Sequence, residues 1–215
     1  MMTIKCLPMN MLDENCYIIH DDTCEAIIID CGALTSTDEQ NLKDYVCRHN
    51  LKVTHHLCTH MHYDHCFGTA FLWNEYGVAP EFAIADEGLY RGEHDAIFGG
   101  LRDHMRKAHL PAPARYLSDG DIVSFGHHSL KVLATPGHTP GGISFYCEEE
   151  KVVFVGDTLF YCSVGRSDFP GGSFDALYTS IHEKLFTLPE DTRICSGHGL
   201  QTDVAFEMQH NPYVR

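Results

Sequence analysis

The sequence predicts an α/β protein in which two mixed sheets pack face to face with helices on both outer sides. Strand-like and helix-like segments are grouped twice in a similar order, once in each half of the chain. Each group has apolar residues to bury, and a four-layer αββα sandwich buries both sets. Segments rich in His and Asp follow strand-like runs, where α/β folds place their sites. The 215 residues suit a single domain over 1–215.

The first half predicts two strands, a helix, a strand, a second helix and a short strand, at 16–20, 26–30, 37–49, 53–58, roughly 67–76 and 82–85. Thr37 and Gln40 have the spacing of a capping box, which predicts that the first helix begins there. Apolar residues recur at helical spacing after this start.

The second half restarts with strands after a Gly-rich and charged segment, 88–114, in which we expect some helix. The predicted strands are 122–125, 130–134, 143–146, 152–155 and 193–195. Phe174 to Leu185 has the apolar spacing of an amphipathic helix, which Pro189 ends, and a short helix is expected near the C-terminus.

Composition excludes several classes of protein. The net charge of −15, from 30 acidic and 15 basic residues without a basic run, opposes nucleic-acid binding. No apolar run approaches the ~18 residues that span a bilayer, and we see no signal peptide. The ten cysteines are scattered without a C-x-x-C pair, so we expect free thiols and a cytoplasmic protein. The expected partner is a small-molecule substrate. We expect no metal or nucleophile role for Cys66 or Cys162.

The sixteen histidines are the unusual feature of the composition. After the strand at 53–58 the chain reads Thr59-His60-Met61-His62-Tyr63-Asp64-His65. Alternate residues of an extended backbone face one side, so His60, His62 and Asp64 can project together, and a turn would bring His65 to them. Three imidazoles and a carboxylate suit a divalent transition metal.

Three further segments place a His or Asp in a loop after a strand-like run. Gly137-His138-Thr139-Pro140-Gly141 forces a tight loop that presents His138. Asp157 follows Gly156, and His198 lies between Gly197 and Gly199. Each segment alone is ordinary, and their recurrence predicts one shared site.

Together these motifs resemble the metallo-β-lactamase superfamily, most closely its glyoxalase II (hydroxyacylglutathione hydrolase) branch. The resemblance extends from 15–17 to 211–213. It implies one metal held by His60, His62 and His138, a second metal held by Asp64, His65 and His198, and Asp157 as the bridge between them. The implied cofactor is two divalent ions: zinc suits this ligand set, and iron and manganese also fit.

The chemistry expected from this centre is hydrolysis of a small thioester or related acyl bond by a metal-bridging hydroxide, with Asp64 and Asp157 in the catalytic set. Two cations lower the pKa of a shared water toward ~7 and polarise a carbonyl. A thiolate leaving group, with an ordinary pKa of ~8.5, needs little help from a general acid.

The loop at 159–172 leaves the bridging Asp157 and is expected to contact the substrate, with Tyr161 and Arg166 as candidates. Arg166 is the only basic residue of this loop. It suits bidentate pairing with a substrate carboxylate, and equally a structural ion pair with Asp168.

Classical glyoxalase II enzymes bind glutathione with a C-terminal helical domain, and we expect this protein to do without one, because few residues follow His198. Segment 88–114 is the candidate replacement wall, through four basic residues: Arg91, Arg102, Arg106 and Lys107.

Other functions stay open at this point. A persulfide dioxygenase, which holds one iron with two His and one Asp, shares much of the motif, but the Gly-His-Gly context of His198 favours the hydrolase. A metal-binding scaffold without activity is disfavoured by the complete ligand set. A β-lactamase is disfavoured because we see no export signal.

Overall fold

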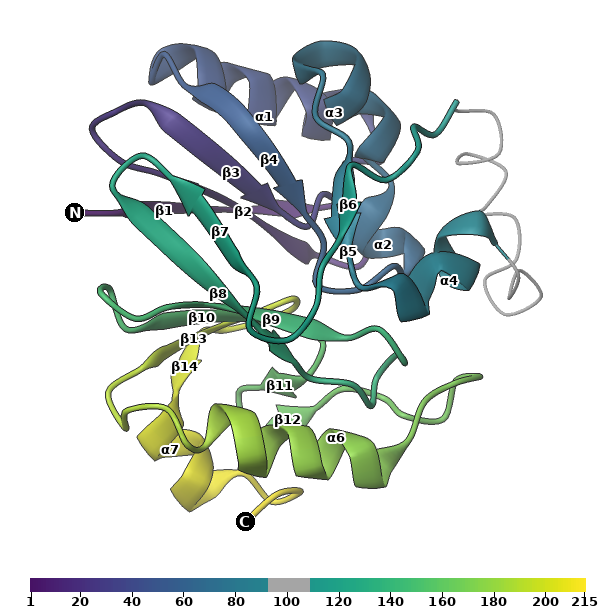
Figure 1. Ribbon diagram of the computed structural model, residues 1–215, viewed down its shortest axis with the longest axis vertical. Coiled ribbons are helices and arrows are strands. Elements are labelled where there is room, and N and C mark those ends of the chain that lie inside the picture. The colour runs from purple at the N-terminus through teal and green to yellow at the C-terminus, as the bar shows by residue number, and fades with distance from the viewer. Residues whose placement is uncertain (93–108) are drawn as a thin grey trace.

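The computed structural model describes residues 1–92 and 109–215, which form four layers (Figure 1). Two sheets lie face to face in the middle. Helices α1 (Ser36–Arg48) and α3 (Thr69–Tyr76) cover the outer side of the first sheet. Helices α6 (Phe174–Ser180) and α7 (Val204–His210) cover the outer side of the second. The predicted αββα sandwich is confirmed.

The first sheet has six strands in the described part of the chain, in the order β1-β2-β3-β4-β5-β6. Strands β1, β2 and β3 pair antiparallel, whereas β3 to β6 pair parallel, with α1 and α3 in the connections. The bounds are β1 Thr3–Met9, β2 Glu14–His20, β3 Glu25–Ile29, β4 Lys52–Leu57, β5 Pro80–Phe82 and β6 Arg115–Tyr116.

The second sheet has the order β14-β13-β10-β9-β8-β7, and only β10 and β13 among its described pairs are parallel. Its bounds are β7 Ile122–Phe125, β8 His128–Ala134, β9 Ile143–Cys147, β10 Val152–Gly156, β13 Arg193–Ser196 and β14 Thr202–Asp203. The remaining elements are α2 Tyr63–Cys66, the 3₁₀ turn η1 Ile84–Asp86, α4 Glu87–Arg91, the π-helical turn η4 Ile181–Leu185 and the ribbon β11 Leu159–Phe160 with β12 Ser163–Val164.

Strands β2, β9 and β10 are buried along their whole length because both faces of each sheet are covered. On β2, Tyr17 and Ile19 belong to the core between the sheets, where Tyr17 packs edge-on against Phe154 of β10. Cys16 and Ile18 point the other way, into the core beneath α1 and α3. Side chains of a strand alternate between faces, so a continuous apolar run fills two cores at once.

Two local predictions were wrong, and a third differs from the structure only at a helix boundary. The capping box of α1 is formed by Thr35 and Asp38, not by Thr37 and Gln40, because Thr35 has the extended backbone that an N-cap requires. The predicted strand 82–85 ends at Phe82, and a 3₁₀ turn follows it. The predicted helix 67–76 starts at Thr69, after the separate short helix α2.

Strand β1 was not predicted at all. Most of its side chains are partly exposed, so it lacks the apolar run that marks the inner strands. Within 1–92 and 109–215 no helix has an apolar stretch long enough to cross a membrane.

Candidate metal centre

The seven predicted ligands meet at one edge of the sandwich, because each follows a strand that ends there, either in a loop or, for Asp64 and His65, in the short helix α2. His60 and His62 follow β4 of the first sheet, whereas His138, Asp157 and His198 follow β8, β10 and β13 of the second. A hydrogen bond between the two sheets, from the backbone N–H of Ile143 to the carbonyl of Thr59 (2.9 Å), holds the first loop beside the others.

The ligand atoms fall into two groups, each with its nitrogen and oxygen atoms within 4.8 Å of one another. In the first group, His62 Nδ1 lies 2.8 Å from His138 Nε2. In the second group, His198 Nε2 lies 3.2 Å from Asp64 Oδ2 and 3.2 Å from His65 Nε2. The first group is His60, His62 and His138, and the second group is Asp64, His65 and His198. The structure thus brings together the sets that the resemblance implies, while their role as ligands stays a prediction.

Asp157 faces both groups. Its Oδ2 lies 3.5 Å from His138 Nε2 of the first group, and its Oδ1 lies 3.3 Å from His65 Nε2 of the second. Asp157 also forms a compact set of its own with His60 and His65. A carboxylate in this position could contribute one oxygen to each group.

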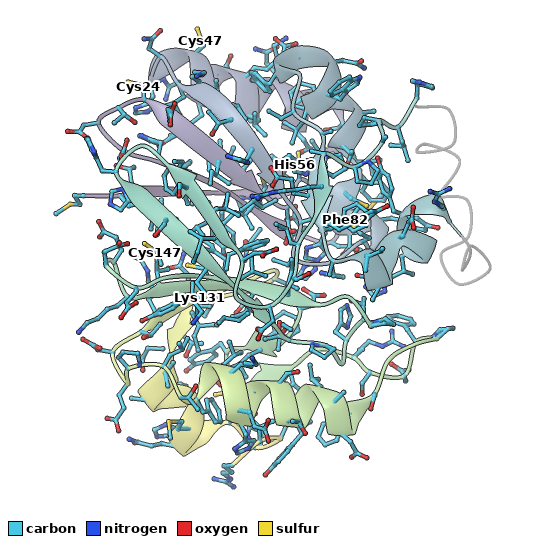
Figure 2. All side chains as sticks on the ribbon, viewed as in Figure 1. Cys24, Cys47, His56, Phe82, Lys131 and Cys147 are labelled. Atoms are coloured by element: carbon cyan, nitrogen blue, oxygen red, sulfur yellow. The ribbon has the colours of Figure 1, made fainter. Side chains whose placement is uncertain are left out.

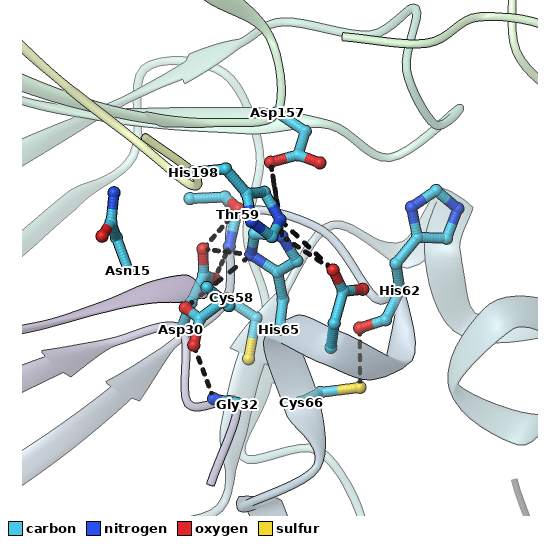
Figure 3. A network of polar contacts seen from close by, with 12 residues as sticks. Asn15, Asp30, Gly32, Cys58, Thr59, His62, His65, Cys66, Asp157 and His198 are labelled. Carbon is cyan, nitrogen blue, oxygen red and sulfur yellow. Dashed lines mark hydrogen bonds and ion pairs between the residues drawn. The ribbon is translucent and has the colours of Figure 1, made fainter. Parts of the chain in front are cut away.

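Asp30 at the end of β3 orients the second group from behind (Figure 3). Its carboxylate accepts hydrogen bonds from the backbone N–H (2.7 Å) and the hydroxyl (2.8 Å) of Thr59, and from His65 Nδ1 (3.0 Å). An acceptor on Nδ1 holds a proton there and turns Nε2 of His65 toward the centre, the nitrogen that would bind a metal once it has lost its proton.

Backbone carbonyls orient the rings of two other predicted ligands, His138 and His198. His138 Nδ1 donates to the carbonyl of Arg166 (2.6 Å), and His198 Nδ1 donates to the carbonyl of Leu12 in the β1–β2 turn (3.0 Å). Both rings therefore turn Nε2 toward the centre, so their orientation suits metal binding.

The electrostatics of the site fit a divalent transition metal. His60 is buried, and its Nε2 has no hydrogen-bond partner among the described residues. Burial and the neighbouring imidazoles lower the pKa of His60 well below its usual value and lower that of His62 to about 3. Both rings are therefore neutral at physiological pH, which is the form that binds metals. Burial lowers the pKa of His65, but the carboxylates of Asp157 and Asp64 outweigh it and raise the pKa.

Sequence reasoning missed the supporting residues, although one signal was available. Asp30 stands at the end of an apolar run, where a carboxylate needs a reason to be buried. Asn15 also supports the site: its amide donates to the carbonyls of Ser196 (3.0 Å) and Gly199 (3.1 Å), which flank His198.

Two histidines that the motif does not include, His55 and His56, have partners outside the seven ligands. His55 Nδ1 lies 2.5 Å from Glu81 Oε1, and His56 Nε2 lies 3.5 Å from the thiol of Cys58. His56 and Phe82 stand on the neighbouring strands β4 and β5 (Figure 2). His127 and His128 belong to the β7–β8 turn and the start of β8.

The ten cysteines are free thiols. Cys24, Cys47 and Cys147 lie at the end of the sandwich away from α4 (Figure 2). Cys66 lies close to the centre, but its thiol donates to the carbonyl of His62 (3.1 Å) and its pKa is raised by burial. A buried, protonated thiol is a poor nucleophile and a poor ligand.

A cavity of about 520 Å³ opens onto the two groups. Arg166 lines it, but the guanidinium is held by Asp168 through two hydrogen bonds (2.9 and 2.8 Å) and lies 4.2 Å from the ring centroid of Phe169. Apolar side chains form part of the wall beside the two groups: Leu12, Phe67, Phe160, Val164 and Phe169.

Other predicted substrate contacts lie elsewhere. Tyr161 stacks on Phe206 of α7, with ring centroids 5.0 Å apart, and is not among the residues that line the cavity. Arg91 pairs with Glu87 at the exposed surface. The other three basic residues of the predicted wall, Arg102, Arg106 and Lys107, lie outside the described residues.

A two-sheet sandwich with His and Asp loops gathered at one edge defines the class, and comparison with known proteins agrees. Residues 10–198 match the metallo-beta-lactamase superfamily. The chain is 34% identical over 219 residues to hydroxyacylglutathione hydrolase GloC of Haemophilus influenzae, covering 99% of this chain and 98% of that protein.

Among solved structures the chain is similar to the BLEG-1 B3 metallo-beta-lactamase, with a TM-score of 0.86, 32% identity and 99% of each chain covered. It is also similar to TTHA1623 in a di-iron-bound form, with a TM-score of 0.82, 32% identity, and 97% of this chain and 99% of that one covered. The protein belongs to the metallo-β-lactamase superfamily, as its motifs predicted.

Proposed function

We propose that the protein is a hydrolase with two metal ions that cleaves a small thioester, of the 2-hydroxyacyl-glutathione kind, or a related acyl substrate. The observation that carries this proposal is Asp157, whose two carboxylate oxygens face the first and the second group at the base of one cavity. Similarity to a hydroxyacylglutathione hydrolase supports the substrate class, and similarity to a di-iron protein supports the pair of ions.

Each residue of the site would have a distinct role in this reaction. The first and second groups would hold the ions, and Asp157 would join them. When bound, two divalent cations supply a nucleophile from water at neutral pH and polarise the acyl carbonyl. Asp30 keeps Nε2 of His65 turned inward. Phe67, Phe160 and Phe169 line the cavity and would keep water from the apolar part of the substrate. The departing thiolate is stable enough to leave without a dedicated acid.

The test is reconstitution of metal-free protein with zinc, followed by assays of thioester hydrolysis and oxygen uptake. We expect thiol release without oxygen consumption, and loss of that activity in His60→Ala. Zinc is the decisive ion because it has no redox chemistry. Two results together would instead establish a dioxygenase: the zinc-loaded protein hydrolyses none of the thioesters, and the iron-loaded protein consumes oxygen when a glutathione persulfide is added. Faster turnover of a β-lactam than of thioesters would establish a lactamase.

Arg166 provides a second prediction, about substrate charge. Arg166→Ala should raise KM for a thioester that carries a carboxylate by about tenfold and leave KM for a neutral thioester nearly unchanged, because one charge-assisted pair is lost. Asp168→Ala is the matched variant: it releases the guanidinium from its ion pair and should lower KM for the carboxylated substrate. If both substrates respond equally to both changes, Arg166 only braces its own loop.

A further inference from the structure

We propose that Asp86, a buried carboxylate outside the seven ligands, is a positioning residue that assembles the first group and so sets its affinity for metal. This inference rests on the metal sites of the proposed function. It adds a residue that is absent from the cavity lining and whose described side-chain hydrogen bonds come from residues other than the seven ligands.

Asp86 is fully buried at the end of η1, and both of its oxygens are used. Oδ2 accepts hydrogen bonds from the backbone N–H of Met61 (3.1 Å) and from the hydroxyl of Thr139 (2.8 Å). Oδ1 accepts from the backbone N–H of Gly141 (2.6 Å). A carboxylate that receives three donors in a buried place is strongly held, and it holds those donors in turn.

The three donors belong to the two loops that carry the first group. Met61 stands between His60 and His62, and Thr139 follows His138. These loops leave different sheets, β4 in the first and β8 in the second. Asp86 therefore fixes the distance between the loop that carries His60 and His62 and the loop that carries His138. Metal affinity depends on that separation because the ligands must already lie at coordination distance.

Gly141 gives independent support. A Cβ atom at this position would lie 2.6 Å from Cγ of Asp86 and 2.7 Å from its backbone nitrogen, so any side chain would displace the carboxylate. The glycine in the Pro140-Gly141 turn is thus required by close approach to Asp86. Gly141→Ala should reproduce the effect of removing the carboxylate without changing Asp86.

Asn10 supplies the matched control on the second group. Its amide donates to the carbonyls of Gly32 (2.9 Å) and Asp64 (3.0 Å), so it braces the chain at a ligand of that group. The described donors to the Asp86 carboxylate are Met61, Thr139 and Gly141, and all three lie beside the first group. The two supports should therefore affect different metals.

The experiment is a zinc titration of metal-free protein against a competing chelator, with zinc anomalous diffraction to assign each site. Asp86→Asn and Gly141→Ala should each weaken the first-group zinc by about 10- to 100-fold, the usual cost of losing a residue behind a ligand, and leave the second within about threefold. Asn10→Ala should show the opposite selectivity. Thr139→Ser, which keeps the hydroxyl donor, should bind like the parent, whereas Thr139→Val should weaken the first zinc.

The outcomes separate this inference from the proposed function. If the parent protein binds fewer than two zinc ions, the two-metal proposal fails first. If it binds two, and Asp86→Asn weakens both equally or neither, the positioning role is wrong. A lower unfolding temperature of the metal-free variants with unchanged zinc affinity would also overturn it, because Asp86 would then act on the fold alone. Thr139→Val keeps the test available if Asp86→Asn does not fold.

Discussion

Replacing Asp157 with alanine should remove both metals and lower kcat/KM for thioesters by on the order of 10³-fold, the scale on which lost transition-state electrostatics act. The reason is its position: one oxygen lies 3.5 Å from His138 Nε2 and the other 3.3 Å from His65 Nε2. Because Asp157 faces both groups, its removal takes one oxygen ligand from each metal site. Elemental analysis of metal per chain, measured with thioester turnover, tests this.

Asp64→Ala is the control for Asp157→Ala, because Asp64 belongs to the second group alone. It should lose one metal and keep the other, which the first group still holds, and His198→Ala should do the same. If the Asp157→Ala protein retains one full equivalent of metal per chain, Asp157 serves a single site. Loss of both metals from Asp64→Ala would contradict the division into two groups.

Gly197→Ala should weaken metal binding at the second group although it removes no ligand. A Cβ atom at Gly197 would collide with Oδ1 of Asp157 and would lie 2.6 Å from Cε1 of His65. Neither neighbour can yield easily, because both are packed in the centre and Asp30 holds the His65 ring. We expect about a 100-fold loss of zinc affinity at the second group, by analogy with other displaced ligand supports.

Gly199→Ala offers the same change two residues along the loop. No described atom lies within 4 Å of a Cβ built there, but its φ of +71° is in the left-handed region. The variant should therefore lose about 1–2 kcal/mol of stability and keep its metal. If Gly197→Ala and Gly199→Ala lose zinc alike, general strain in the loop explains the effect and the specific collision does not.

The sequence predicted the layers and the gathering of the seven side chains because both follow from short-range patterns. Apolar strands buried on two faces leave continuous runs such as 152–155, and a His-x-His-x-Asp-His stretch after a strand is a local signal. The order of strands in each sheet then brings loops from distant parts of the chain to one edge.

The supporting residues could not be predicted in this way, because their roles exist only across the fold. Asp86 is an ordinary acidic residue in the sequence, and its three donors come from loops after two other strands. Tyr161 looked like a cavity residue by its nearness to Asp157 in sequence, yet its ring stacks on α7. The cap at Thr35 depended on backbone geometry that several nearby Ser and Thr residues could have provided.

The distribution of the ligands along the chain sets the order in which the centre can be completed during synthesis. The first sheet supplies His60 to His65 early, the first group is complete once His138 has left the ribosome, and the second must wait for His198 near the end. At roughly 5–20 residues per second, this leaves an interval on the order of seconds in which a nascent chain holds one assembled group and a half-formed neighbour. Ions taken up cotranslationally should enter the three-histidine group first.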